Sequence, residues 1–173
     1  MLKTITAEML DGLSAEAMRS RRLRRNRNLH VSLQDPVQRL CNAFEPGTYV
    51  RPHRHAQEER WELFVVLRGA ATLLIFDDRG TVLQRMEIDA GGPTLGVEIP
   101  PRTWHAIASR APGTVLFEVK PGPYSQSDDK EFAGWAPDEE HHVAAREFED
   151  WYQDAGAGAI PPPLVSPGSK GVV

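Results

Sequence analysis

The stretch from about residue 37 to residue 120 constrains the fold most, because it consists of short strand-like runs separated by turn residues. Runs such as "ELFVVLR", "ATLLIFD" and "TVLFEVK" alternate with turn segments such as "DDRG", "DAGGP" and "RAPG". Regular short strands without helices between them predict an antiparallel sandwich or barrel. "LFVVL" and "TLLIF" are apolar at successive positions, which predicts that both of their faces are covered, by a second sheet, a helix or another subunit.

Helical patterns flank this region. Residues 6–20 predict one or two short helices, with Thr6 and Ser14 as caps and Gly12 as an interruption. The segment "EEHHVAAREFEDWYQ" predicts a helix near the other end of the chain. Its expected apolar stripe consists of Val143, Phe148, Trp151 and Tyr152.

We therefore expect four parts along the chain. They are an N-terminal helical and basic segment (1–35), a β-barrel (36–125), a C-terminal extension with a helix (126–155) and a flexible tail rich in Gly, Ala and Pro (156–173).

Composition excludes several classes of protein. A chain of 173 residues can bury a core without disulfides, and the single cysteine, Cys41, cannot form an internal one. The net charge of -4 argues against general nucleic-acid binding. No apolar run approaches the roughly 20 residues of a membrane helix, and the amino terminus lacks the apolar core of a signal peptide. These features predict a cytoplasmic protein with no nucleic-acid partner and no membrane insertion.

One segment departs from this acidic balance. Residues 19–27 contain six arginines: Arg19, Arg21, Arg22, Arg24, Arg25 and Arg27. One interpretation is a solvated basic face or loop. The other is a segment near a site that binds an anion, such as a phosphate or a sugar nucleotide.

Four residues form a candidate metal-binding set. His53 and His55 are two positions apart, so they project from one side of an extended strand. Glu62 opens the next strand-like run, and because paired strands lie about 5 Å apart its carboxylate can reach the same point. His105 supplies a third imidazole. Such ligands suit Zn, Fe, Mn, Ni or Co, and a six-coordinate ion would keep open positions for water or substrate.

These residues resemble the two sequence motifs of the cupin superfamily. The first, G-x5-H-x-H-x(3,4)-E-x6-G, is matched by Gly47, His53, His55, Glu62 and Gly69, although six residues separate His55 from Glu62. Glu59 lies nearer the usual position but breaks the count to the final glycine, so Glu62 is preferred. The second, G-x5-P-x-G-x2-H-x3-N, is matched at Pro100 and His105, with Arg102 and Ser109 replacing its second glycine and its asparagine and with the opening glycine out of register.

The resemblance implies an all-β, cupin-type double-stranded β-helix barrel (jelly-roll-like) with short flanking helices at both termini. It also implies one divalent transition metal (Zn, Fe, Mn or Ni) bound by the four residues. Over about residues 3–138 the chain further resembles the WbuC family of cupin-fold metalloproteins, whose genes are associated with lipopolysaccharide and polysaccharide clusters and whose reaction is unassigned.

The expected function is Lewis-acid chemistry of the isomerase or epimerase type on a small carbohydrate or sugar-acid-like molecule. Two alternatives stay open: an Fe(II)-dependent cupin dioxygenase, and a non-catalytic module that binds a small molecule. The apolar strand runs and the way cupin subunits often pack together also predict a homodimer.

Candidate substrate contacts outside the metal set are Arg51, Arg102, Glu118, Tyr124 and His30. Arg51 shares the strand parity of His53. A structural role is the alternative for each: a surface arginine, a strand residue facing away, loop packing or a structural histidine.

Overall fold

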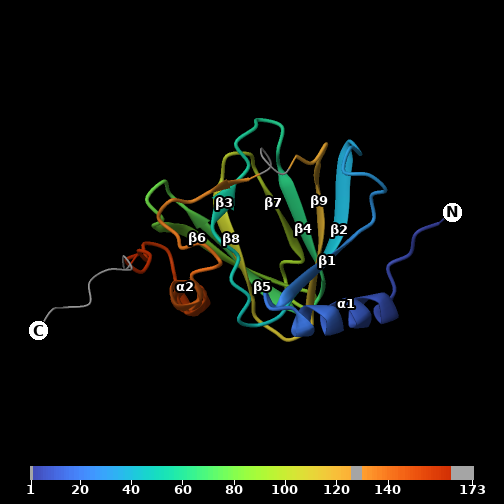
Figure 1. The fold of residues 1–173 in the computed structure, drawn as a ribbon, viewed down its shortest axis with the longest axis horizontal. Helices are drawn as coiled ribbons and strands as arrows, with labels where there is room; N and C mark the ends of the chain where they lie inside the picture. The colour runs from blue at the N-terminus through green and yellow to red at the C-terminus, as the bar shows by residue number, and fades with distance from the viewer. Residues whose placement is uncertain (1, 126–129, 165–173) are drawn as a thin grey trace, which may run out of the picture.

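The computed structural model describes residues 2–125 and 130–164. In this part of the chain, two five-stranded antiparallel sheets face each other and a helix lies outside each of them (Figure 1). The first sheet contains, in spatial order, β1 (Arg24–Asn28), β2 (Val37–Phe44), β9 (Thr114–Pro121), β4 (Glu62–Arg68) and β7 (Gly96–Ile99). The second contains β10 (Glu131–Phe132), β3 (His53–Arg54), β8 (Trp104–Ser109), β5 (Ala70–Phe76) and β6 (Val82–Asp89). The predicted all-β barrel with helices at both ends is confirmed.

Helix α1 (Ala7–Arg19) begins where the sequence predicts, because the Thr6 hydroxyl accepts a hydrogen bond from the Met9 backbone N–H. The predicted interruption at Gly12 is wrong: the helix is continuous. Gly12 is exposed, and a single glycine weakens a helix by about 0.5–1 kcal/mol without having to end it.

The two helices explain why the strand runs are apolar on both faces. Leu73 of β5 belongs to the interior cluster, whereas the next residue, Leu74, packs outward with Phe148 and Tyr152 of α2 (His142–Asp154). On the other sheet, α1 packs against Cys41, Ala43 and Val115. The chain's own helices supply this cover, so the homodimer stays a prediction that light scattering would test.

The apolar stripe of α2 differs from the predicted one at one residue. Val143 is 78% exposed, whereas Ala145, Phe148 and Tyr152 are buried. Val143 belongs to the first turn and points away from the sheet, which a helical period alone does not reveal. Neither helix in the described ranges has the length and apolar character of a membrane span.

Part of the predicted tail contacts the barrel. The Val82 N–H donates to the Ala159 carbonyl at 2.9 Å, and the Gly158 N–H donates to the Val82 carbonyl at 2.8 Å. Residues 165–173 of that predicted tail, and residues 126–129 of the predicted extension, lie outside the described residues.

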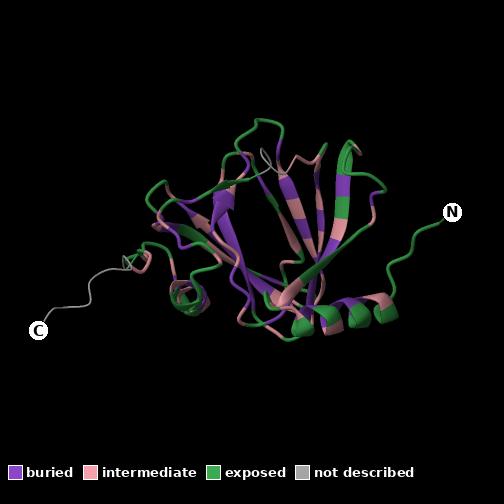
Figure 2. Cartoon of the chain, viewed as in Figure 1, coloured by how far each residue is buried: buried purple, intermediate pink, exposed green. Residues whose placement is uncertain are grey.

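The barrel interior contains a continuous apolar cluster. Its fully or largely buried members come from both sheets and are Phe44, Phe64, Val66, Ala71, Leu73, Ile88, Ile99, Ile107 and Leu116. Figure 2 shows buried residues alternating with less buried ones along β4, as expected for a strand with one face toward a core. On β4, β8 and β9 this inward face continues into polar residues, which form the candidate site.

Candidate metal centre

Three strands and one loop bring the four predicted ligands together. His53 on β3 lies directly opposite His105 on β8, and their ring centroids are 4.4 Å apart. Ligand atoms of His53, His55 and Glu62 all lie within 4.8 Å of one another. Glu62 Oε1 is 3.0 Å from His55 Nε2, and Glu62 Oε2 is 3.0 Å from His105 Nε2. All four side chains are buried.

Hydrogen bonds to the backbone orient two of the imidazoles. The Nδ1 atoms of His53 and His105 lie 2.9 Å from the carbonyl oxygens of Arg51 and Thr103. A carbonyl only accepts, so we assign the ring proton to Nδ1, and Nε2 then carries a lone pair. This arrangement is typical of metal-binding histidines.

The donor atoms fit a bound cation. Among the described residues, His105 Nε2 and Glu62 Oε2 are buried and form no hydrogen bond. Their lone pairs therefore face each other at 3.0 Å, which is unfavourable unless a cation lies between them. Imidazole nitrogens and a carboxylate oxygen are suitable ligands for a divalent transition metal.

Electrostatics favours the protonation states that bind metal. Burial lowers the pKa of the His53 imidazole well below its usual value, which keeps the ring neutral. Burial by itself would raise the pKa of the Glu62 carboxyl, but the adjacent imidazoles of His105 and His55 and the charge of Lys120 lower it well below its usual value. Neutral imidazole and ionised carboxylate are the forms that coordinate metals.

The departures from the cupin motifs have a structural explanation. Glu59, the alternative carboxylate, is exposed on the loop before β4, whereas Glu62 is buried on the strand. Residues 56–59 are exposed, so this loop accommodates the extra residues between His55 and Glu62. Arg102 has a φ of 62°, the left-handed conformation in which glycine, the residue of the motif, is free of strain.

A buried polar network continues from Glu62 across the first sheet. Lys120 Nζ is 3.3 Å from Glu62 Oε1 and 3.0 Å from Glu118 Oε1, and the Asn42 side-chain amide donates to Glu118 Oε2 at 2.6 Å. Sequence reasoning left open whether Glu118 faces the interior; it does, and so does Lys120, two positions farther along β9. It did not identify Asn42, although that residue lies two positions before the inward-facing Phe44.

A cavity of about 580 Å³ opens beside these residues and is lined by His53, Glu62 and His105. Of the predicted substrate contacts, Arg51, Glu118 and Tyr124 line it. The basic segment also contributes: Arg22, Arg24 and Arg25 are part of the same lining. This location favours the interpretation of residues 19–27 as a segment near a site.

Two predicted contacts lie elsewhere. His30 Nδ1 accepts a hydrogen bond from the Arg39 backbone N–H at 3.1 Å, across the hairpin between β1 and β2. Arg102 is largely exposed and pairs with Glu58 at 3.1 Å. Neither belongs to the cavity lining among the described residues.

Comparisons with known proteins agree with the fold. A family model described as "Domain of unknown function (DUF6016)" matches residues 5–88. No curated protein matches the sequence significantly. The salicylate 1,2-dioxygenase from Pseudoaminobacter salicylatoxidans is 11% identical with a TM-score of 0.54, covering 75% of this chain and 37% of that chain. A Shewanella oneidensis protein is 12% identical with a TM-score of 0.52, covering 78% of this chain and 87% of that chain.

Likeness at these identities shows the fold alone, and the WbuC resemblance stays a prediction. A cupin-superfamily protein from Desulfitobacterium hafniense is also similar, at 20% identity and a TM-score of 0.44, covering 57% of this chain and 76% of that chain. Two facing antiparallel sheets, a helix at each end and the two neighbours with TM-scores of 0.54 and 0.52 together indicate a cupin-type β-barrel fold.

Proposed function

We propose that the protein is a metal-binding cupin in which His53, His55, Glu62 and His105 hold one divalent transition metal (Zn, Fe, Mn or Ni). The observation that carries this proposal is the buried contact of Glu62 with the Nε2 atoms of His55 and His105, at 3.0 Å each, in the wall of a cavity. The lone pair that the assigned tautomer of His105 turns toward this buried carboxylate is unfavourable unless a cation lies between the two groups.

We further propose that the protein acts on a small carbohydrate or sugar-acid-like molecule by isomerase or epimerase chemistry. A bound metal would supply Lewis acidity toward a carbonyl or enediol oxygen. Glu118 lines the cavity, and its carboxylate is held by Lys120 and Asn42. It is therefore the candidate group for moving a proton on the substrate. The resemblance to the WbuC family favours a substrate from polysaccharide metabolism.

Elemental analysis of the natively expressed protein tests the metal centre. We expect close to one equivalent of metal per chain in the wild type and its loss in His105→Ala and Glu62→Gln. Glu59→Gln is the matched control, because it removes the exposed alternative carboxylate and should keep the metal. Unchanged metal content and thermal stability in His105→Ala would show that the ligand assignment is wrong.

The two alternatives predict other results with the same protein. An Fe(II)-dependent dioxygenase would consume oxygen when Fe(II) and a candidate substrate are added. A non-catalytic module would bind a small molecule tightly and release it unchanged after long incubation with the metal-loaded protein.

A further inference from the structure

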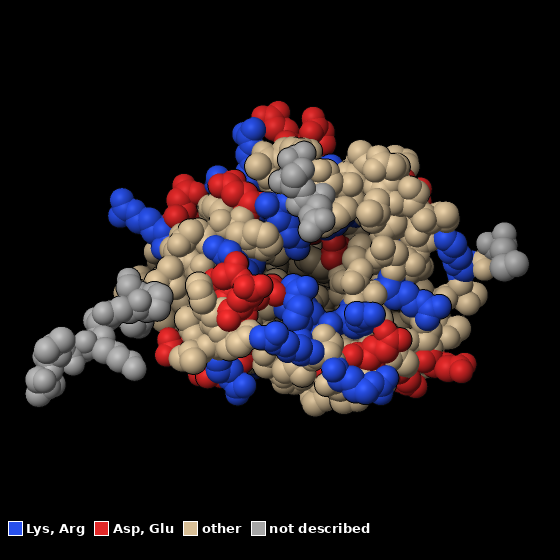
Figure 3. Space-filling view, viewed as in Figure 1, with Lys and Arg blue, Asp and Glu red and all other residues tan. Residues whose placement is uncertain are grey.

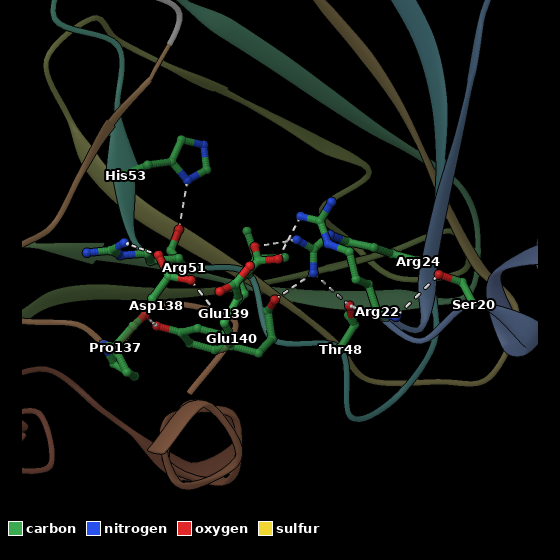
Figure 4. Close-up of polar contacts among 12 residues, drawn as sticks. Ser20, Arg22, Arg24, Thr48, Arg51, His53, Pro137, Asp138, Glu139 and Glu140 are labelled. Carbon is green, nitrogen blue, oxygen red and sulfur yellow. Dashed lines mark hydrogen bonds and ion pairs between the residues drawn. The ribbon is translucent and has the colours of Figure 1, made fainter. Parts of the chain in front are cut away.

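Two arginines and one glutamate form an unusual group at the mouth of the cavity (Figure 4). Arg22 Nη2 lies 2.7 Å from Glu139 Oε2, and Arg24 Nη2 contacts the other oxygen of the same carboxylate, Oε1. Arg24 belongs to β1, Arg22 precedes it, and Glu139 lies in the loop before α2. The two guanidinium groups therefore hold a single carboxylate, and each contacts one of its oxygens.

Arg24 is the fixed member of this group. Its side chain is 15% exposed, and its Nη1 atom donates to the Tyr49 carbonyl at 2.6 Å. A buried guanidinium needs an anionic partner, because otherwise its charge is not compensated. Arg22 is 61% exposed, so solvent screens its pair with Glu139 and that pair contributes little to stability. Arg24 therefore needs an anion beside it, and in this structure a loop residue, Glu139, supplies that anion.

The loop that carries Glu139 has separate attachments. Asp138 Oδ2 pairs with Arg51 Nη1 at 2.9 Å, and the Tyr49 hydroxyl donates to the Pro137 carbonyl at 2.9 Å. These contacts hold the loop whether or not the Glu139 side chain stays between the arginines. The side chain can therefore move away without displacement of the loop backbone.

The group belongs to the cavity of the candidate metal centre. Arg22, Arg24 and Glu139 line the same cavity as His53 and His105. Five cationic side chains and three carboxylates from the described residues line it: Arg22, Arg24, Arg25, Arg51 and Lys130, with Glu62, Glu118 and Glu139. Figure 3 shows basic side chains gathered beside a hollow near the middle of this face, with acidic ones between them. Arg51 and Arg25 are also paired with Asp138 and Glu16, which lie outside the lining. The excess of positive charge that favours an anionic molecule therefore comes from Arg22 and Arg24, which share one carboxylate.

We propose that Arg22 and Arg24 form a carboxylate-binding subsite of the cavity, and that Glu139 occupies the position which the carboxylate of the substrate takes. Guanidinium groups recognise planar carboxylates through paired hydrogen bonds, and Glu139 already displays that geometry. This proposal rests on the proposed function, because the other end of the substrate would place an oxygen on the metal. The substrate class is therefore a small hydroxy or oxo acid, such as a sugar acid.

Binding of simple carboxylates to the full-length chain tests this subsite. The probes are malonate, D-glucuronate and D-glucose, which is the uncharged counterpart of D-glucuronate. Each is titrated calorimetrically into chelator-treated protein and into Zn-loaded protein. Glu139→Gln should bind malonate and D-glucuronate at least about tenfold more tightly, because it removes a tethered competitor whose effective concentration is in the millimolar range. D-glucose should bind equally weakly to all variants.

Substitution of an arginine then identifies the subsite. Adding Arg22→Ala to Glu139→Gln should abolish the gain, and circular dichroism should show that both variants are folded. Arg27→Ala and Glu147→Gln are matched controls, since each removes the same charge from an exposed position outside the cavity lining. Equal malonate affinity in Glu139→Gln and wild type, or a gain that survives Arg22→Ala, would overturn the proposal.

The malonate titration of chelator-treated protein separates this proposal from the metal assignment. A gain in malonate affinity together with unchanged metal content in His105→Ala supports the subsite and rejects the ligand set. Loss of metal in His105→Ala without any gain in malonate affinity rejects the subsite and supports the ligand set.

Discussion

The two halves of the barrel interior are formed by the same strands but have opposite chemical character. On β4 the inward-facing residues run from Glu62 to Phe64, and on β8 from His105 to Ile107. β9 runs antiparallel to β4, so its inward face changes from apolar Leu116 to polar residues in the reverse order along the chain. One half is therefore an apolar core, and the other contains the candidate metal centre.

This difference separates the part of the interior that stabilises the fold from the part that would bind a metal and a substrate. The apolar half gains free energy by burying side chains in close contact. The polar half buries charged groups, whose desolvation is compensated only when each has a partner or a cation. Damage to one half should therefore leave the property of the other largely intact.

Substitution in the apolar half should have the largest effect on stability. Leu116 is fully buried in the interior cluster, so Leu116→Ala should lower the free energy of unfolding by about 2–5 kcal/mol. Urea titration measures this loss, and Leu83→Ala at a position that is 59% exposed is the control. Metal content of the folded Leu116→Ala protein should equal that of the wild type. Loss of metal from the folded variant would show that the two halves are coupled.

Removal of metal should have a smaller effect on the free energy of unfolding, because it changes only the polar half of the interior. Free metal at 100 times its dissociation constant stabilises a folded site by about 2.7 kcal/mol, so a chelator should remove about that much. Wild type and Leu116→Ala should lose the same amount, as measured by urea titration with and without chelator. A chelator effect that persists in His105→Ala would contradict the assigned ligands.

Acidification of the metal-free protein should have the smallest effect on the free energy of unfolding. Burial lowers the pKa of folded His53, so below about pH 6.5 the unfolded chain binds a proton that the folded protein does not. Stability should therefore decrease as pH falls from about 6.5 toward the lower folded pKa, by up to about 1.4 kcal/mol per pH unit. Urea titrations at several pH values should show a shallower dependence in His53→Gln than in His141→Ala. Equal slopes would mean that His53 is not a buried neutral histidine.

Local patterns predicted much of the fold and the residues of the candidate metal centre. The alternation of apolar and turn residues predicted the strands, and Thr6 predicted the start of α1, because each depends on neighbours in the chain. His53, His55, Glu62 and His105 were found from strand parity and motif spacing. The predictions of a break at Gly12 and of a buried Val143 were wrong, because packing of a helix against a sheet overrides local preference.

By itself, the sequence determined that the chain forms a β-barrel and that Glu62 can lie beside His53 and His55, because strand alternation and short spacings act over a few residues. His105 is far along the chain from Glu62, and the resemblance to the second cupin motif placed it in the same site. Only the tertiary structure decided which arginines of the basic segment reach the cavity and what neutralises them. Arg24 and Glu139 are separated by 115 positions, and they meet because β1 pairs with β2 while the loop before α2 attaches to Arg51. Such a contact depends on how distant elements pack, and no local period encodes it.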